Sequence, residues 1–169
     1  MGTVPAVLCA LVAGVLAGLV TSAIYSWLHI PDLLAGILTM TMIYSINLRV
    51  MGNAANISFL RVPTLFSRII DGMYDVLPAV ENPEWGILAF LVLVMALIKG
   101  LLDLFFHTDM GLTMGALGAN EQLVVSQGVN PVVLRTIGIC AGNALAALAG
   151  AFAAMYNGFA DVGMGTGIV

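Results

Sequence analysis

Few side chains in this sequence of 169 residues are of the kinds that perform chemistry. His29 and His107 are far apart, and neither has the neighbouring ligands that a metal site needs. No GxxxxGK[ST] segment is present to bind nucleotide phosphates, and no serine has a histidine and an acid close to it in sequence. We therefore expect no catalytic residue, no metal site and no cofactor bound by this chain, and we expect that it is not an enzyme.

One pair of opposite charges lies inside an apolar stretch. Lys99 and Asp103 are four residues apart, which places them on the same face of a helix. Such a pair is compatible with a proton relay or an ion site. It is also compatible with an ion pair near a helix end, where the lysine stem lies along apolar surface and its ammonium reaches the headgroups. We favour the structural ion pair.

The composition favours a membrane protein. Hydrophobic residues make up 61% of the chain and charged residues 8%, and the mean hydropathy is +1.08. Soluble domains carry about 25% charged residues, so this chain lacks the side chains that a water-facing surface requires. The net charge of −4 gives no reason to expect a nucleic-acid partner. Cys9 and Cys140 lie in apolar stretches, where we expect small buried residues rather than a disulfide.

Four apolar segments have the length of membrane-spanning helices. A span needs about 20 residues, and the predicted spans are 4–28, 31–49, 86–106 and 132–156. The fold class is therefore predicted to be an all-α, polytopic membrane helix bundle, formed by one transmembrane domain over residues 1–169. No charged side chain precedes Asp32, so a signal peptide with a positive n-region is not predicted.

Small residues recur at every fourth position in two of these spans. In a membrane, rows of small side chains let helix backbones approach closely, because packing rather than exclusion of water drives association. The alternative is that small residues are simply common in such spans. The residues predicted to form these packing rows are Ala10, Gly14, Gly18 and Ser22 in the first span, and Gly138, Gly142, Ala146, Gly150 and Ala154 in the fourth.

The second span is the most polar one. Polar groups at membrane depth need partners, so they face other helices or a wet pathway. The alternative is that the hydroxyls bond to carbonyls of their own helix. Asn143, beside the row in the fourth span, is expected to bond across to another helix. The candidate pathway-lining residues are Thr39, Thr41, Tyr44, Ser45, Asn47 and Asn143.

Between the second and third spans, residues 49–85 leave the hydrocarbon. Leu65, Phe66, Ile69, Ile70 and Met73 fall on one face of a helix, and Ser67, Arg68 and Asp71 on the other. This pattern predicts an amphipathic helix that lies in the membrane interface, with Gly72 weakening its end. A gate over the substrate path is the alternative.

The stretch 107–131 has its own helix signals between two apolar spans. Asn120 can accept the unpaired amide hydrogens of a short helix that begins at Glu121, whose charge suits the positive end of the helix dipole. Gly128 can adopt the left-handed conformation that ends this helix. Asn130 and Pro131 then cap and begin the next one. A short helix held between two long ones is predicted.

This stretch resembles the cytoplasmic loop of permease subunits from bacterial ABC importers of the branched-chain amino acid and ribose type. That family's pattern is roughly T-x-x-G-x-x-x-x-A-x-G-x-N-x-x-x-A-x-x-x-G-I-N. The matching positions are Thr108, Gly111, Ala116, Gly118, Asn120, Gly128 and Asn130. Val129 stands in place of isoleucine, Val124 in place of a small residue, and the family's basic residue after the first glycine is missing. The segments IPDLLAGILTMTMIYSINLRVMG and NALAALAGAFAA also resemble spans of these permeases.

The resemblance implies a transport subunit of the inner membrane that performs no chemistry itself. Its partners would be a cytoplasmic ATPase that binds the ATP, a second permease subunit as homodimer or heterodimer, an extracytoplasmic solute-binding protein and the lipid bilayer. The solute would be an amino acid or a similar small polar molecule, with tryptophan/tyrosine-type permeases the most similar subgroup. The residues implied to contact the ATPase are Gly118, Asn120, Glu121, Gln122, Leu123, Val124, Gln127 and Gly128.

Chain length, membrane orientation and an alternative function need further consideration beside the resemblance. Family permeases are about twice this length, so spans are expected to be missing on both sides. A cytoplasmic loop also puts Arg49, Arg61 and Arg68 outside while only Lys99 and Arg135 flank the inner side, which opposes the positive-inside rule. Because these counts are small and acids are intermixed, the rule is weak here, and we follow the resemblance. The alternative function is a small oligomeric membrane scaffold or channel without an ATPase partner.

Overall fold

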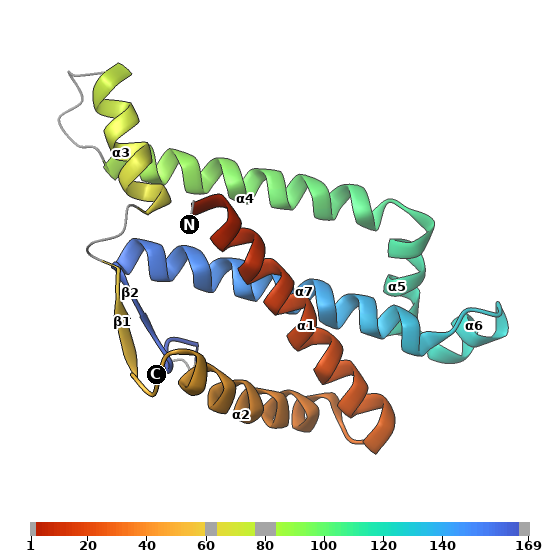
Figure 1. Ribbon diagram of the computed structural model, residues 1–169. Helices are drawn as coiled ribbons and strands as arrows, with labels where there is room; N and C mark the ends of the chain where they lie inside the picture. The colour runs from red at the N-terminus through yellow and green to blue at the C-terminus, as the bar shows by residue number, and fades with distance from the viewer. Residues whose placement is uncertain (1–2, 60–63, 77–83, 166–169) are drawn as a thin grey trace. The chain divides into compact units, whose positions relative to one another are not determined.

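The computed structural model of the chain describes residues 3–59, 64–76 and 84–165 (Figure 1). Its contacts separate two compact units. One unit contains Met1–Leu65 with Thr136–Val169, and the other contains Phe66–Arg135. Each unit is described by itself below.

Four long helices dominate the described residues, and their 18-residue windows have mean hydropathies from 1.5 to 2.5. By length and composition each is able to cross a membrane. Their ends lie within two residues of the predicted spans. The predicted all-α, polytopic membrane fold is confirmed. The helices are α1 (Thr3–Leu28), α2 (Asp32–Val50), α4 (Glu84–Phe106) and α7 (Pro131–Asn157).

Most of the apolar surface of these helices is uncovered by the rest of the chain. Only 6% to 22% of each apolar window is buried, and large side chains such as Leu93 and Met95 are more than 60% exposed. Water would penalise this surface by about 25 cal/mol per Å². Lipid or other protein must therefore cover it.

Helices α1 and α2 are joined by a tight reversal. His29 adopts a left-handed conformation with φ of 53°, and its amide donates to Tyr25 O, which ends α1. Pro31 then precedes the first residue of α2, where a proline loses no hydrogen bond. The interface between the two helices contains a hydroxyl pair, because Thr39 Oγ1 accepts a hydrogen bond from Thr21 Oγ1 at 3.0 Å.

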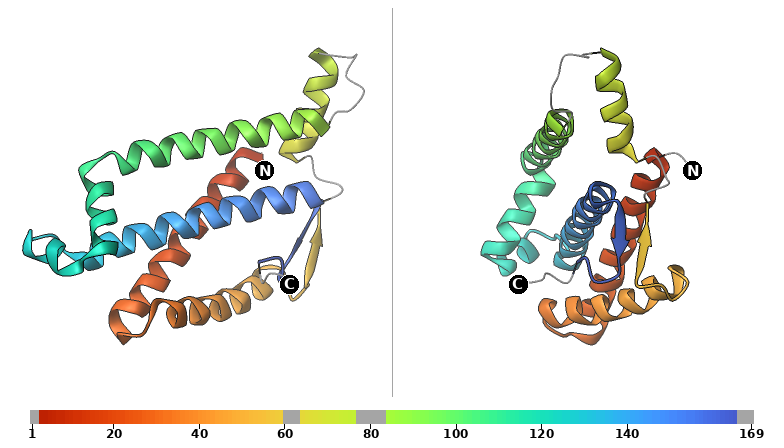
Figure 2. Two further views of the ribbon diagram at one scale, coloured as in Figure 1. Left: turned by 180° about the vertical axis from the view of Figure 1, so that it is seen from behind. Right: turned by 90° about the vertical axis from the view of Figure 1, so that its left-hand side faces the viewer.

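Helix α1 also crosses α7 within the same unit (Figures 1 and 2). A Cβ atom on Gly14 would lie 2.6 Å from Asn143 O, and one on Gly18 would lie 2.6 Å from Cys140 Cα. Ser22 and Thr136 join the two helices by a hydroxyl contact of 2.5 Å. Positions rise along α1 as they fall along α7, so the two helices run antiparallel. Gly14 and Gly18 thus lie where backbone meets backbone.

The row predicted on α7 is not the face that meets α1. Cβ atoms added to Gly142 or Gly150 would meet nothing within 4 Å, and Ala146 is exposed. The face toward α1 instead carries Thr136, Cys140, Asn143, Ala144 and Ala147. A shorter run of small residues at the same spacing, Thr136, Cys140 and Ala144, lies on this side of α7. Packing by the row of Gly138, Gly142, Ala146 and Gly150 stays a prediction.

The two cysteines differ from each other. Cys140 is half-buried at the α1 crossing, whereas Cys9 is exposed. The prediction that both are buried is therefore wrong for Cys9. An apolar stretch in a membrane helix does not imply burial by protein, because lipid also accepts such side chains.

A short antiparallel pairing ties the ends of α2 and α7 together. Strand β1 (Asn56–Ser58) pairs with β2 (Phe159–Asp161), with Ile57 opposite Ala160. The pairing is extended by a hydrogen bond of 2.7 Å from the Phe59 amide to Gly158 O. Figure 2 shows these strands beside each other. The sequence did not predict them, since three-residue strands carry no readable periodicity.

Helix α3 (Leu65–Val76) is the predicted amphipathic helix. Phe66 is 3% exposed and packs edge-on against Phe90 of α4, with ring centroids 6.3 Å apart. Its apolar side is thus occupied at this point by another helix. The helix continues four residues past Gly72, and the weakening of its end by this glycine stays a prediction. The side chains of Ile69, Asp71 and Met73 lie outside the described residues, and location in the membrane interface stays a prediction.

The charged pair in α4 is an ion pair. Lys99 Nζ lies 2.8 Å from Asp103 Oδ2, one helical turn away. Both side chains are more than half exposed, which makes this pair worth about 1 kcal/mol or less. The favoured structural interpretation of these two residues is confirmed.

Candidate functional site

The candidate site is the segment between α4 and α7, which contains α5 (Asp109–Ala119) and α6 (Glu121–Ser126). A sharp turn leads from α4 into α5. Thr108 Oγ1 accepts a hydrogen bond from the Gly111 amide at 3.3 Å and so caps α5. A side chain on Gly111 would collide with the backbone at Phe105 O. The T-x-x-G spacing is therefore required by the turn, whereas sequence reasoning missed the helix that follows.

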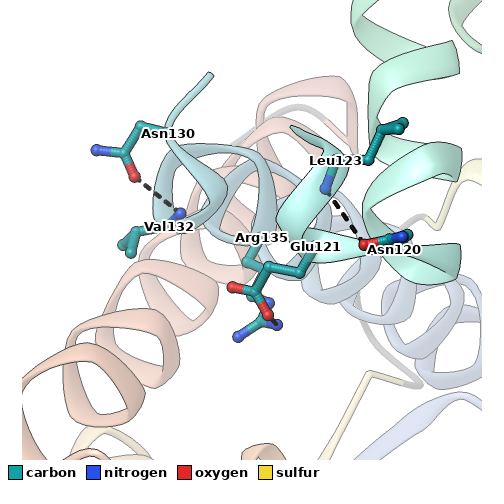
Figure 3. A network of polar contacts seen from close by, with 6 residues as sticks. All are labelled: Asn120, Glu121, Leu123, Asn130, Val132 and Arg135. Carbon is teal, nitrogen blue, oxygen red and sulfur yellow. Dashed lines mark hydrogen bonds and ion pairs between the residues drawn. The ribbon is translucent and has the colours of Figure 1, made fainter. Parts of the chain in front are cut away.

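Asn120 links α5 to α6. Its amide donates to Ala116 O at 2.8 Å, which satisfies the end of α5. Its side-chain oxygen accepts a hydrogen bond of 3.2 Å from the Leu123 amide, as drawn in Figure 3. One extended residue, with φ of −155°, thus ends one helix and caps the next. The predicted N-cap is confirmed.

The exit from α6 is fixed in the same way. Gly128 has φ of 81°, a left-handed conformation that favours glycine. Asn130 Oδ1 then accepts a hydrogen bond of 2.9 Å from the Val132 amide, and Pro131 begins α7 (Figure 3). The predicted helix end and the following cap are both confirmed. Because both ends are set by backbone conformation and capping, α6 has a defined position between α5 and α7.

A small apolar core lies beneath α6. Leu117 of α5, Val124 of α6 and Leu134 of α7 are 8%, 1% and 3% exposed and pack together, with Ala116 and Val129 beside them. Val124 was expected to face a partner protein. It faces this core instead, and that expectation is wrong. The bulk of Val124 fills space between three helices.

An ion pair connects α6 to the start of the second turn of α7. Glu121 Oε2 lies 2.9 Å from Arg135 Nη2, with side chains 48% and 32% exposed (Figure 3). Sequence reasoning placed Glu121 at the helix N-terminus but assigned no contact to Arg135. The pair is separated by 14 residues and a reversal of the chain, so no helical periodicity signals it.

The other side of α6 is exposed and partly apolar. Leu123 and Val125 are 50% and 51% exposed, and Figure 3 shows the Leu123 side chain directed away from Glu121 and Arg135. The remaining predicted contact residues, Gly118, Gln122, Gln127 and Gly128, are also exposed. The segment thus offers a fixed helix with two uncovered aliphatic side chains and little charge around them. Val125 was not singled out from sequence.

The candidate pathway residues differ in their hydrogen-bond partners and in their burial. Thr41 donates to Leu38 O and Ser45 to Thr41 O, both within α2, and Tyr44 and Asn47 are exposed. Thr39 is buried at the α1 interface.

Asn143 was expected to bond across to another helix. Its side chain instead donates to Ile139 O of its own helix, at 2.9 Å, so this expectation is wrong. A side-chain amide can donate to the carbonyl four residues earlier in its own helix, so it needs no second helix. A role of any of these residues in lining a pathway stays a prediction.

The chain is similar to known proteins over nearly its whole length. The family model described as "Branched-chain amino acid transport system / permease component" matches residues 1–169. A protein named "Tyrosine transport system permease protein" from Clostridioides difficile (strain R20291) is 38% identical over 167 residues, which cover 97% of this chain and 50% of that protein. An uncharacterized protein of Rickettsia prowazekii (strain Madrid E) is 35% identical over 167 residues, covering 99% of this chain and 55% of that protein. The chain spans about half the length of these curated relatives. No solved structure matches it.

Proposed function

The chain belongs to the family of permease components of branched-chain amino acid transport systems, and on this premise we propose that it is a permease subunit of an ABC importer whose helix α6 docks on a cytoplasmic ATPase. In this role it forms part of the path of the solute across the membrane and performs no chemistry. ATP is bound and hydrolysed by the partner.

The observation that carries the proposal is the exposed side of α6. Leu123 and Val125 are half exposed, although the same helix buries Val124 almost completely. A six-residue helix has little stability of its own, yet α6 is capped at Asn120 and packed against α5 and α7. A helix held in this way can move as a rigid body and pass its movement on. Closure of the ATPases on ATP would displace α6, and the attached spans would switch between outward-open and inward-open states.

The proposed solute is an amino acid. This follows from the relative that is named a tyrosine transport permease and is 38% identical, and an aromatic amino acid is the first one to test. Further partners in the proposal are a second permease subunit, as homodimer or heterodimer, and an extracytoplasmic solute-binding protein. The uncovered apolar surface of α1, α2, α4 and α7 agrees with contacts to lipid and to a second subunit.

The proposal also assigns sides of the inner membrane. Docking on an ATPase requires α6 to lie in the cytoplasm, which puts β1 and the connection that follows it on the outer side. The β1–β2 pairing agrees with this, because it joins the end of α2 to the end of α7 that is remote from α6. With so few basic residues, the positive-inside rule weighs little against it.

A substitution at Leu123 tests the docking in the complete transporter with its ATPase. Leu123→Asp puts an unpaired carboxylate into an apolar contact, where desolvation costs several kcal/mol. We expect normal membrane insertion, loss of ATPase co-purification and no uptake. Leu123→Met, which keeps size and apolarity, should retain all three properties. Uptake and ATPase co-purification at wild-type levels in Leu123→Asp would reject the docking role of α6.

A further inference from the structure

One exposed side of α4 carries apolar side chains followed by a pair of charges. Leu88, Val92 and Met95 are 53%, 58% and 75% exposed. Lys99 and Asp103 continue the same side of the helix, because successive members of the set are three or four residues apart. These five residues are called the Lys99 face below.

Helix α3 packs against the opposite side of α4. Phe66 of α3 contacts Phe90 with ring centroids 6.3 Å apart, and Ile87 is only 7% exposed. Phe90 precedes Lys99 by nine residues, which is about two and a half turns of a helix, so the two side chains leave α4 in opposite directions. The Lys99 face is thus exposed in the part of the chain that the structure describes.

The two charges of this face lie inside a membrane-spanning helix. Lys99 is seven residues before the end of α4 at Phe106, about 10 Å along the axis at 1.5 Å per residue. Its Nζ lies 2.8 Å from Asp103 Oδ2, with side chains 74% and 58% exposed. This pair uses one of the three ammonium donors and one of the two carboxylate oxygens. Exposed charges within a span need further polar partners.

The order of groups along the Lys99 face matches that of a phospholipid with an amine in its headgroup. In such a lipid the acyl chains are deepest, the phosphate follows, and the ammonium is outermost. Toward the end of α4 the apolar side chains come first, the cation of Lys99 follows, and the anion of Asp103 lies one turn further out. Lys99 can therefore donate to a phosphate while Asp103 accepts from an ammonium. A phosphatidylglycerol headgroup offers the phosphate but no cation for Asp103.

From this complementarity we propose that the Lys99 face of α4 binds a phospholipid with a primary ammonium in its headgroup, such as phosphatidylethanolamine. An acyl chain lies along Val92 and Met95, the phosphate contacts Lys99, and the ammonium contacts Asp103. The proposal requires only that α4 spans the membrane. It goes beyond the proposed transport function and is independent of the docking of α6.

The test uses the complete transporter without Cys9 and Cys140, in nanodiscs that contain equal amounts of phosphatidylethanolamine and phosphatidylglycerol with the same acyl chains. A benzophenone group on a single cysteine at Met95 captures the neighbouring acyl chain on illumination, and mass spectrometry identifies the captured lipid. We expect phosphatidylethanolamine to be captured about two- to five-fold more often, the range of one partly exposed charge contact. The same group at Leu93, which is 62% exposed on another side of α4, should capture both lipids equally.

Reversal of the two charges gives a matched variant. Lys99→Asp with Asp103→Lys keeps the ion pair and the net charge but places the anion deeper than the cation, so the preference at Met95 should be lost. Lys99→Arg keeps a cation at the same depth and should retain the preference. Asp103→Asn removes only the partner of the ammonium and should also lose it, which decides the matter if the reversed variant does not accumulate in the membrane.

Two results would overturn the lipid site. One is equal capture of the two lipids at Met95 in the wild type, or no capture there because another subunit covers this face. The other is a preference for phosphatidylethanolamine that Asp103→Asn and the charge reversal leave unchanged.

Discussion

The Leu123 amide donates a hydrogen bond of 3.2 Å to Asn120 Oδ1, so the residue that caps α6 is tied to the residue whose side chain faces outward. The orientation of the exposed leucine therefore depends on a polar group one turn earlier. An N-cap of this kind contributes about 1 kcal/mol to a helix.

Removal of this cap is predicted to increase local opening of α6. In Asn120→Ala the Leu123 amide loses its acceptor, and its hydrogen exchange should become about five-fold faster. Asn120→Asp keeps an acceptor at the same position and should exchange as the wild type does. Hydrogen exchange measured by mass spectrometry on peptides that cover α6 checks both variants. Equal exchange in Asn120→Ala and wild type would mean that the cap does not hold the helix.

The core beneath α6 should be more sensitive to truncation than its outer side. Val124→Ala removes two methyl groups from a side chain that is 1% exposed, which we expect to cost about 1.5–3 kcal/mol of stability. Val125→Ala, at a position 51% exposed, should cost less than about 0.5 kcal/mol. Thermal unfolding in detergent compares the two. Equal melting temperatures would contradict the inward orientation of Val124.

Replacement of two glycines of α5 by alanine is predicted to change the thermal stability in opposite directions. Gly111→Ala places a methyl group against the backbone of Phe105 and Phe106, which has little freedom to move, so the turn between α4 and α5 should be destabilised. Gly115→Ala meets nothing within 4 Å and should stabilise the helix by up to about 1 kcal/mol. Thermal unfolding in detergent again provides the measurement. A stable Gly111→Ala protein would show that the turn differs from the one described.

Two glycine-to-leucine variants distinguish packing within the chain from packing with another subunit. Gly18→Leu should prevent the α1–α7 crossing, because its first added carbon would lie 2.6 Å from Cys140 Cα. Gly142→Leu has open space in this chain and should leave the fold intact, while it disrupts assembly through the row of small residues on α7. Leu148→Ala, off that row, should assemble normally. Size-exclusion chromatography in detergent reports both whether each variant is folded and whether it assembles. Normal assembly of Gly142→Leu would exclude that row as an interface.

Much of this structure follows from local sequence signals. Apolar segments of 19 to 27 residues mark the spans, and the caps at Asn120, Gly128 and Asn130 depend on residues within a few positions of each other. These features are readable because their physical cause lies within one helix turn or one membrane thickness.

Contacts between segments that are distant in the chain could not be predicted from the sequence in this way. The Glu121–Arg135 pair, the β1–β2 pairing and the choice of the α7 face that meets α1 all depend on which segments become neighbours in space. The side of α7 toward α1 carries a shorter run, Thr136, Cys140 and Ala144, than the predicted row, so the length of a run of small residues does not identify the packed face. Val124 was misassigned for a related reason, since a short helix has too few residues for its periodicity to reveal a buried side.

Sidedness is tested by labelling. In a protein without Cys9 and Cys140, single cysteines at Gln122 and Ala54 are predicted to react from opposite sides of the membrane. Ala54 follows α2 near the β1–β2 pairing, and Gln122 lies in α6. A membrane-impermeant maleimide applied to intact cells should label Ala54→Cys only. Labelling of Gln122→Cys under these conditions would reverse the assigned orientation.

The most direct measurement is a cross-link between α6 and the ATPase. In the complete transporter without Cys9 and Cys140, a cysteine at Leu123 and a short thiol–amine cross-linker should capture the ATPase subunit, since Leu123 lies at the centre of the proposed contact. A cysteine at Ala54, on the other side of the membrane, is the matched control and should capture none. An ATPase band from Leu123→Cys alone is the result that our account predicts. Absence of that band from an active transporter, with the ATPase present, would contradict it.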